Sequence, residues 1–137
     1  ALADTAQFCA AYDVPPEVSA NCVVVAGRRG GEERVAACMV LATTRADVNG
    51  VVRRRLDVRK ASFLSTEAAV DATGMEYGGI TPIGLPTEWP ILVDPAVADL
   101  PFAIIGSGVR RSKLALPGSA LAALPGATVV DDLARPT

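Results

Sequence analysis

Residues 74–85 read Gly-Met-Glu-Tyr-Gly-Gly-Ile-Thr-Pro-Ile-Gly-Leu, which places four glycines and a proline between two more regular segments. Glycine allows backbone angles and close approaches that a side chain forbids, so Gly78 and Gly79 free the amides that follow them to point into a cleft. Pro82 fixes its own φ and biases Thr81 away from helical angles, which stiffens the end of the loop. A rigid run of outward amides suits an anionic transition state or a phosphate. A tight turn between two sheet elements is the simpler alternative, but the length of the loop and its Gly-x-x-x-Pro ending favour a functional role.

The segments before this loop predict two paired strands followed by helices. The β-branched run 21–26 is typical of a buried strand. Glycines at 30–31 predict a hairpin into a second, antiparallel strand over 34–42. Residues 43–47 are expected to form a loop, at the end of which Asp47 begins a helix. The other elements expected here are a helix from Asp4, a short strand at 60–64 and a helix from Ser65 to Gly74.

The segments after the loop predict a second glycine bend that can face the first. A strand at 91–93 is followed by Asp94-Pro95, which caps a helical turn. A strand at 102–105 is then broken by Gly106-Ser107-Gly108. The remaining elements are a half-exposed strand over 110–116, a helix at 119–124, a strand at 128–130 and a polar tail. Because strands and helices alternate without a regular βαβ repeat, the expected fold is a mixed-sheet α/β or α+β domain.

Length and composition predict one soluble cytoplasmic domain. The 137 residues fit a single domain over 1–137. Half of the residues are hydrophobic, but no apolar run approaches the eighteen or so residues of a membrane span, and the first residues lack the pattern of a signal peptide. Three cysteines, an odd count without a C-x-x-C pair, argue against a disulfide framework or a zinc site.

The chain contains no histidine, which excludes Ser-His-Asp and Cys-His catalysis and imidazole ligation of a metal. Any chemistry must therefore use carboxylates, lysine, hydroxyls, water or the substrate. Cys22 is a poor nucleophile, since no histidine can activate its thiol and its Val-rich strand suits a small buried residue. The spacing of the acidic residues does not indicate a metal cluster, so neither a metal nor a cofactor is expected.

The basic residues are unevenly distributed. The net charge is −2, yet 10 of the 13 basic residues fall in three clusters. If these clusters converge in space, they form an arginine-rich face that tracks phosphates. If they do not, each is an ordinary solvated patch. The clusters are Arg28-Arg29, then Arg53-Arg54-Arg55 with Arg59-Lys60, then Arg110-Arg111 with Lys113.

The order of the motifs resembles the YbaK/EbsC family of aminoacyl-tRNA editing domains, the freestanding relatives of the insertion domain of bacterial prolyl-tRNA synthetase. The similarity extends from about Thr5 to Leu133, and its most specific part is 78–85. It implies a mixed sheet curled into a partial barrel with flanking helices. It also implies a trans-acting deacylase that hydrolyses mischarged tRNA for translation fidelity. The implied partners are the tRNA acceptor end and an aminoacyl-tRNA synthetase, without a cofactor or a membrane, for a monomer or homodimer.

The resemblance also implies a site. The amides of the family's Gly-x-x-x-Pro element hold the aminoacyl carbonyl and position water, and its second glycine-rich bend lies near the terminal adenosine. A plain β-bulge is the alternative for that second bend. The residues implied for the first role are Gly78, Gly79, Ile80, Thr81 and Pro82, and those for substrate binding are Gly106, Ser107, Gly108, Arg110 and Lys113.

The chain departs from the family in one strand, where a lysine followed by a small polar residue is replaced by Asn21 and Cys22. Asn21 can form hydrogen bonds with a carbonyl or a phosphate but supplies no positive charge. Lys113 follows the second glycine bend and is therefore a better candidate than Lys60 to take the place of the family's lysine. The alternative is that Lys113 is an exposed lysine on an edge strand.

Three functions therefore remain open. The first is deacylation of a tRNA that carries a small wrong amino acid, such as Ala, Ser or Cys on tRNA-Pro or a similar tRNA. The second is binding of the tRNA acceptor end or an aminoacyl group without turnover, which Asn21 favours. The third is hydrolysis of a small ester or thioester unrelated to tRNA.

Overall fold

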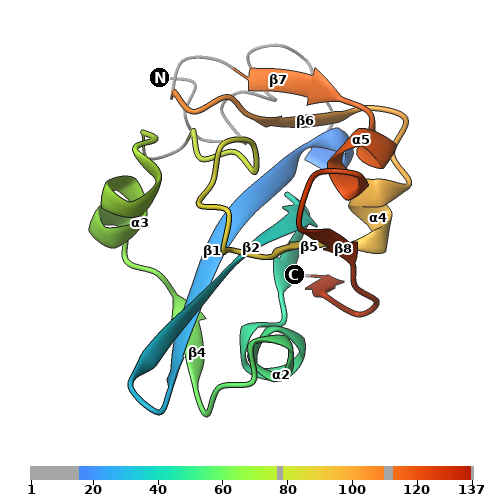
Figure 1. Ribbon diagram of the computed structural model, residues 1–137. Helices are drawn as coiled ribbons and strands as arrows, with labels where there is room; N and C mark the ends of the chain where they lie inside the picture. Colours follow the sequence, from blue (N-terminus) through green and yellow to red (C-terminus); the bar gives the residue numbers. More distant parts are fainter. Residues whose placement is uncertain (1–15, 77–78, 110–112, 137) are drawn as a thin grey trace.

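The computed structural model describes residues 16–76, 79–109 and 113–136. A five-stranded sheet with the order β4-β1-β2-β5-β8 forms its centre (Figure 1). Strands β1 and β2 form the predicted antiparallel hairpin, and β4 adds an antiparallel edge beside β1. Beyond β2, strands β5 and β8 continue the sheet in parallel. The bounds are β1 (Ala20–Arg29), β2 (Glu32–Leu41), β4 (Ala61–Phe63), β5 (Ile91–Val93) and β8 (Ala127–Val129).

Short helices and two further strand pairs surround this sheet. In Figure 1, strands β6 and β7 cross above one end of β1, helix α3 lies on one side, and α4 and α5 lie on the other. The antiparallel pair β6–β7 is connected by an isolated bridge from Ile104 to Ser19, the residue directly before β1. These elements are η1 (Pro16–Val18), η2 (Val48–Val52), α2 (Arg53–Leu56), α3 (Thr66–Thr73), α4 (Pro95–Ala98), α5 (Gly118–Ala122), β6 (Ala103–Gly106) and β7 (Lys113–Leu116).

Apolar side chains form two clusters on opposite faces of the sheet. Successive residues of a strand point to opposite faces, and Cys38 and Met39 of β2 accordingly belong to different clusters. The Cys38 cluster packs against Leu56 of α2. The Met39 cluster packs against Ile105 of β6 and Leu121 of α5. The second cluster therefore supports the strand that ends at the second glycine bend.

The structure confirms a mixed sheet with flanking helices and shows that this sheet is not closed. The expected loop at 43–47 is wrong, because it contains β3 (Thr44–Ala46), which pairs with β9 (Ala134–Pro136) in the supposed polar tail. The helix predicted after Asp47 is divided into a π-helical turn, η2, and the short helix α2. The helix predicted from Asp4 lies outside the described residues. Within those residues, no helix is both long and apolar enough to cross a membrane.

Candidate active site

Helix α3 brings the chain to the glycine loop, as the sequence predicts. The Ser65 Oγ accepts a hydrogen bond from the amide of Ala68 at 3.1 Å and caps the start of the helix. Gly74 ends it in the left-handed region, with φ of 69°, and its amide donates to the carbonyl of Val70 at 2.9 Å. The chain therefore leaves α3 in a fixed direction at Met75.

Two backbone hydrogen bonds join the two glycine bends, and a third lies within the first bend. The Glu76 amide donates to the Gly108 carbonyl at 3.0 Å, and the Gly108 amide donates to the Gly79 carbonyl at 2.6 Å. The Gly79 amide donates to the Glu76 carbonyl at 2.9 Å, which closes the first bend on itself. We call this arrangement the glycine clasp and define it as Glu76, Gly79, Gly106, Gly108 and Val109.

The clasp requires glycine at two positions because the two backbones touch there. A Cβ atom on Gly79 would lie 2.6 Å from the carbonyl carbon and oxygen of Val109. A Cβ atom on Gly106 would lie 2.5 Å from the carbonyl oxygen of Ile80. Neither contact is possible without moving a backbone, so the structure explains both glycines by close approach and brings the two predicted bends together.

The amides of the first bend are not all available, which corrects one expectation from the sequence. The Gly79 amide is used inside the clasp, and the Thr81 amide donates to the Met75 Sδ at 3.4 Å. The amide of Ile80 makes no hydrogen bond with another described residue. Of these three amides, that of Ile80 is the one left to hold a substrate oxygen.

Thr81 is buried with its hydroxyl unsatisfied. The residue is 4% exposed, and its Oγ1 has no hydrogen-bond partner among the described residues. Pro82, the next residue, is also buried and fixes this end of the loop. Buried hydroxyls nearly always have a partner, so an unpartnered one requires an explanation. Thr81 directly follows Ile80, so this unsatisfied hydroxyl lies at the end of the first bend.

Asn21 and Cys22 point to opposite faces of β1. Asn21 is half-buried and lies opposite Val40, on the face of the Cys38 cluster. Cys22 lies opposite Met39 and packs with the cluster of Ile105. The two residues predicted as neighbours in the site therefore do not line the same side of the strand.

The Cys22 thiol is a poor nucleophile in this setting. Burial raises the pKa of Cys22 to about 12, with a further contribution from the nearby Cys38. Burial also raises the pKa of Cys38 to about 12. Both thiols are therefore protonated at neutral pH, which supports the interpretation of Cys22 as a packing residue.

The other predicted binding residues lie at the second bend or outside the described residues. The Ser107 Oγ donates to the Val109 carbonyl at 3.4 Å, within the bend. Lys113 begins β7 and lies directly opposite Gly106 in the β6–β7 ladder. Gly78 and Arg110 lie outside the described residues. Met75, Glu76 and Val109 were not predicted, because they contribute through a sulfur atom or the backbone and carry no recognisable sequence motif.

The family of this chain follows from comparison with known proteins. A model of the aminoacyl-tRNA editing domain matches residues 1–124, which include both glycine bends. The chain belongs to the aminoacyl-tRNA editing domain family. This membership confirms the resemblance seen in the sequence and supports aminoacyl-tRNA editing, a deacylase-type hydrolysis, as the general function.

Solved structures share the fold of this editing domain at low sequence identity. The crystal structure of the hypothetical protein APE2540 matches with a TM-score of 0.85 and 20% identity, over 97% of this chain and 85% of the other. The crystal structure of a candidate trans-editing enzyme for prolyl tRNA synthetase matches with a TM-score of 0.80 and 22% identity, over 95% of this chain and 79% of the other. A search of the curated proteins finds no match.

Proposed function

We propose that this editing domain is a trans-acting deacylase, which hydrolyses the ester of a tRNA that carries a small wrong amino acid. Alanine, serine or cysteine on tRNA-Pro or a similar tRNA is the proposed substrate. Family membership supports the reaction class. The observation that carries the proposal for this chain is the glycine clasp, which leaves the Ile80 amide and the buried Thr81 hydroxyl beside two rigid glycine bends.

The clasp supports a mechanism based on backbone donors. Water attacks the ester carbonyl carbon, and the carbonyl oxygen becomes negatively charged. The Ile80 amide stabilises that charge, and the loss of one such donor typically lowers the rate by about a hundredfold or more. The bond between the carbonyl carbon and the ribose oxygen then breaks, and the proton of the water passes to that oxygen. The domain has no histidine to carry this proton, so the neighbouring ribose hydroxyl of the substrate is proposed to relay it.

Thr81 is proposed to position the attacking water. Its hydroxyl can both donate and accept, and it has no partner among the described residues. In the structure the hydroxyl is enclosed and has no partner among the described residues, so the water is proposed to bind there only together with the substrate.

A second function, binding of the acceptor end or an aminoacyl group without turnover, is favoured by one observation. Asn21 stands where the resembled family has a lysine, and the chain has no positive charge at that position. If the lysine is essential for turnover, this domain retains recognition and loses hydrolysis.

Deacylation assays distinguish the two functions. A panel of tRNAs charged with Ala, Ser, Cys or Pro is incubated with the parent protein and with Asn21→Ala and Asn21→Lys variants. The deacylase proposal predicts turnover of at least one small aminoacyl-tRNA by the parent. Binding of tRNA without turnover by the parent, with turnover gained in Asn21→Lys, would establish the binding function instead.

A further inference from the structure

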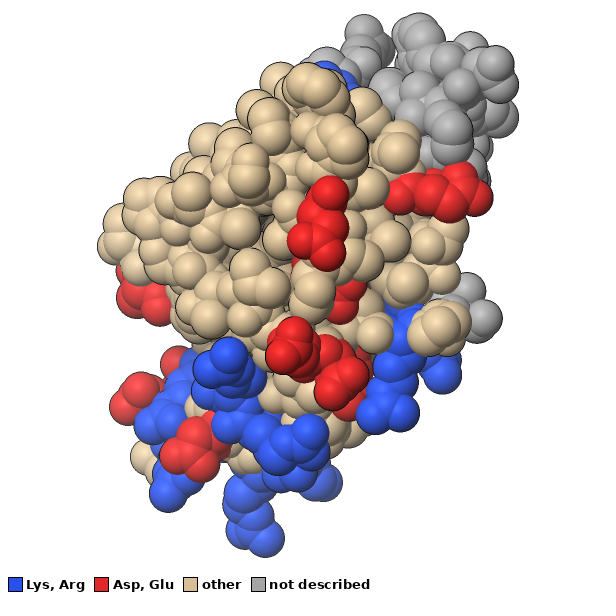
Figure 2. Space-filling view, turned by 90° about the vertical axis from the view of Figure 1, so that its right-hand side faces the viewer, with Lys and Arg blue, Asp and Glu red and all other residues tan. Residues whose placement is uncertain are grey.

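A strongly basic surface lies far from the glycine clasp. Figure 2 shows that the Lys and Arg side chains gather at one end of the molecule. Two segments, 27–34 and 53–60, carry eight basic residues and three acidic ones, in a chain whose net charge is −2. We call this the arginine surface and define it as Arg28, Arg29, Arg34, Arg53, Arg54, Arg55, Arg59 and Lys60.

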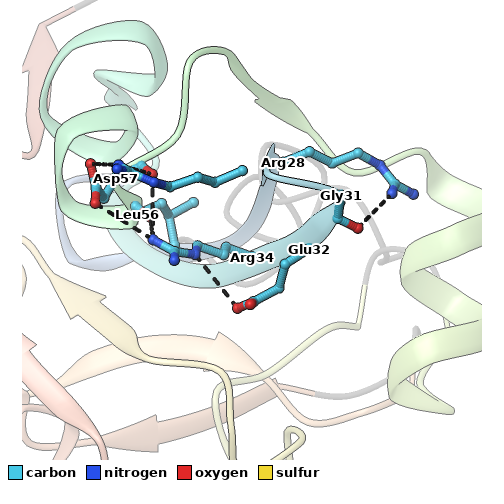
Figure 3. A network of polar contacts seen from close by, with 7 residues as sticks. Arg28, Gly31, Glu32, Arg34, Leu56 and Asp57 are labelled. Atoms are coloured by element: carbon cyan, nitrogen blue, oxygen red, sulfur yellow. Dashed lines mark hydrogen bonds and ion pairs between the residues drawn. The ribbon is translucent and has the colours of Figure 1, made fainter.

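Polar contacts hold the two segments together. The Arg34 Nη1 donates to the Leu56 carbonyl at 3.0 Å (Figure 3), and Arg29 forms an ion pair with Asp57 at 2.5 Å. Ala61, directly after the second segment, pairs with Gly27 in the β1–β4 ladder. The first and second clusters predicted from the sequence therefore converge. Of the third cluster, Lys113 does not join them, because it lies on β7, beside the opposite end of β1, while Arg110 and Arg111 lie outside the described residues.

Most charges of the arginine surface are not neutralised by the protein. Arg29 and Arg34 form ion pairs with Asp57, and Arg34 also lies 3.6 Å from Glu32. Arg28 turns away from Asp57 and donates to the Gly31 carbonyl (Figure 3). The remaining six cations have no ion pair with another described residue, and all except the half-buried Arg53 are exposed. Such a concentration of like charge destabilises the folded chain by self-repulsion, which a bound polyanion would relieve.

The shape of the arginine surface favours an extended polyanion over a small anion. Arg54, Arg55 and Arg135 line a hollow of about 880 Å³, but Asp131 and Asp132 line the same hollow and would repel phosphate. A second hollow, of about 510 Å³, is lined by Arg34 and Arg55 together with three glutamates, Glu32, Glu33 and Glu88. The other five cations of the arginine surface line neither hollow; they are Arg28, Arg29, Arg53, Arg59 and Lys60. Arginines spread over an open surface suit bidentate contacts to phosphates that follow one another along a backbone.

The distance from the clasp matches a duplex stem. The bridge between Ser19 and Ile104 places the start of β1 near the clasp, whereas Arg28 and Arg29 lie at its far end. Arg29 lies eight positions beyond Asn21 along the strand, which is about 26 Å at 3.3 Å per residue. A duplex covers this distance in several base-pair steps. Segments 27–34 and 53–60 contain no aromatic residue, although single-stranded nucleic acids are usually held by stacking on aromatic side chains.

We propose that the arginine surface binds the backbone phosphates of a double-stranded RNA stem whose single-stranded 3′ end reaches the glycine clasp. The inference rests on the proposed function for the identity of the RNA. It adds a second contact region that reads charge and duplex geometry and not base sequence. The clasp then selects the aminoacyl group, and the arginine surface retains the stem.

The test compares two RNA probes and two single substitutions of equal charge. The probes are a hairpin RNA with a single-stranded CCA end and a short single-stranded RNA with the same end. The binding constant of the full chain for each probe is measured at several salt concentrations. Arg54→Gln removes an unpaired cation from the arginine surface, and Arg45→Gln removes an exposed cation of β3 outside it. For the hairpin, Arg54→Gln is expected to weaken binding roughly fivefold at low salt and to reduce the slope of log K against log salt by about 1. Arg45→Gln should leave both quantities unchanged, and neither variant should alter binding of the short strand.

Three results would overturn the inference. Equal effects of Arg54→Gln and Arg45→Gln would show that only net charge matters. An equal effect of Arg54→Gln on both probes would place the arginine at the 3′ end. Binding to vesicles of anionic lipid that is tighter than binding to the hairpin would identify a membrane surface as the partner. Stem binding that depends on Arg54 in a protein without deacylase activity would contradict the proposed function and leave this inference intact.

Discussion

Replacement of Thr81 by valine is expected to make the protein more stable and less active. The Thr81 Oγ1 is buried without a hydrogen-bond partner among the described residues, in a residue that is 4% exposed. A buried, unsatisfied hydroxyl destabilises the folded state by about 1–3 kcal/mol, and valine keeps the β-branched shape while removing the polar atom. For a chain of 137 residues the unfolding entropy is about 0.29 kcal/mol per kelvin. A gain of 1–2 kcal/mol therefore raises Tm by about 3–7 °C.

Thr44 provides the matched control, because its hydroxyl is satisfied. The Thr44 Oγ1 donates to the Leu41 carbonyl at 2.9 Å in a half-buried position. Thr44→Val therefore loses a hydrogen bond and is expected to lower the free energy of unfolding by about 1 kcal/mol. Thermal and denaturant unfolding of the two variants measure both changes, and deacylation measures activity in the same preparations.

Opposite signs of the two stability changes are the decisive feature of this experiment. If Thr81→Val destabilises the protein as much as Thr44→Val does, the Thr81 hydroxyl has a partner in the native state and the reasoning is refuted. If Thr81→Val is more stable but deacylates at the parent rate, the hydroxyl has no part in positioning water. A deacylation rate in Thr81→Val that is at least about tenfold below the parent rate supports the proposed role.

Other predictions concern the clasp, the thiols and one carboxylate. Gly106→Ala and Gly118→Ala should each destabilise the protein by about 1–3 kcal/mol, because both added methyl groups overlap backbone atoms. Only Gly106→Ala should also lower the deacylation rate per folded molecule, by about a hundredfold. Cys22→Ala should retain activity, and peptide mass spectrometry should show slow alkylation of Cys22 and Cys38 at pH 8. Folding raises the pKa of both thiols from 9.0 to about 12, so the stability from their neutral form is full below pH 9 and is lost as the pH rises toward 12. Asp47→Asn keeps an oxygen for the cap but loses the ion pair with Arg135, and it should destabilise by about 0.5–1 kcal/mol near neutral pH, measured by denaturant unfolding.

The Asp47 prediction depends on the direction of its pKa shift. Partial burial alone would raise the pKa of Asp47, but the amide of Val51 and the guanidinium of Arg135, 3.2 Å away, together lower it below its ordinary value of 3.8. Its stabilising effect is therefore full above pH 3.8 and is lost as the pH falls through the lowered value. If the loss of stability caused by Asp47→Asn grows as the pH falls, the direction of the Asp47 pKa shift is wrong. Rapid alkylation of Cys38 would contradict the thiol prediction. Equal loss of activity in Gly118→Ala would show that Gly106 acts only through stability.

Elements with local signals in the sequence were predicted: α3 has nearly the expected bounds, whereas β1 was expected to end at residue 26 and runs on to Arg29. The β1–β2 hairpin follows from a β-branched run and two adjacent glycines, and α3 from a serine cap and a glycine end. The caps at Asp47 and Asp94 were also predicted, and both carboxylates accept amide hydrogen bonds. These features depend on residues close together in the chain, so a single sequence contains their signature.

Contacts between distant segments were harder to predict. The β3–β9 pair joins Thr44 to Pro136, and neither short strand has alternating polarity that would identify it. The meeting of the two glycine bends was predicted, but the use of the Gly79 amide inside the clasp was not, because a backbone hydrogen bond leaves no mark on residue type. The opposite orientation of Asn21 and Cys22 follows from strand alternation once the strand is known.

The central claim is that the glycine clasp hydrolyses the ester of an aminoacyl-tRNA, and Gly79→Ala tests it most directly. The added methyl group would lie 2.6 Å from the backbone of Val109 and would separate the two bends. The measurement is the single-turnover rate of deacylation of Ala-tRNA-Pro by the parent and by Gly79→Ala, each corrected for its folded fraction. The account predicts turnover by the parent and a rate about a hundredfold lower in the variant. Equal rates in the two proteins, or no turnover of any small aminoacyl-tRNA by the parent, would contradict it.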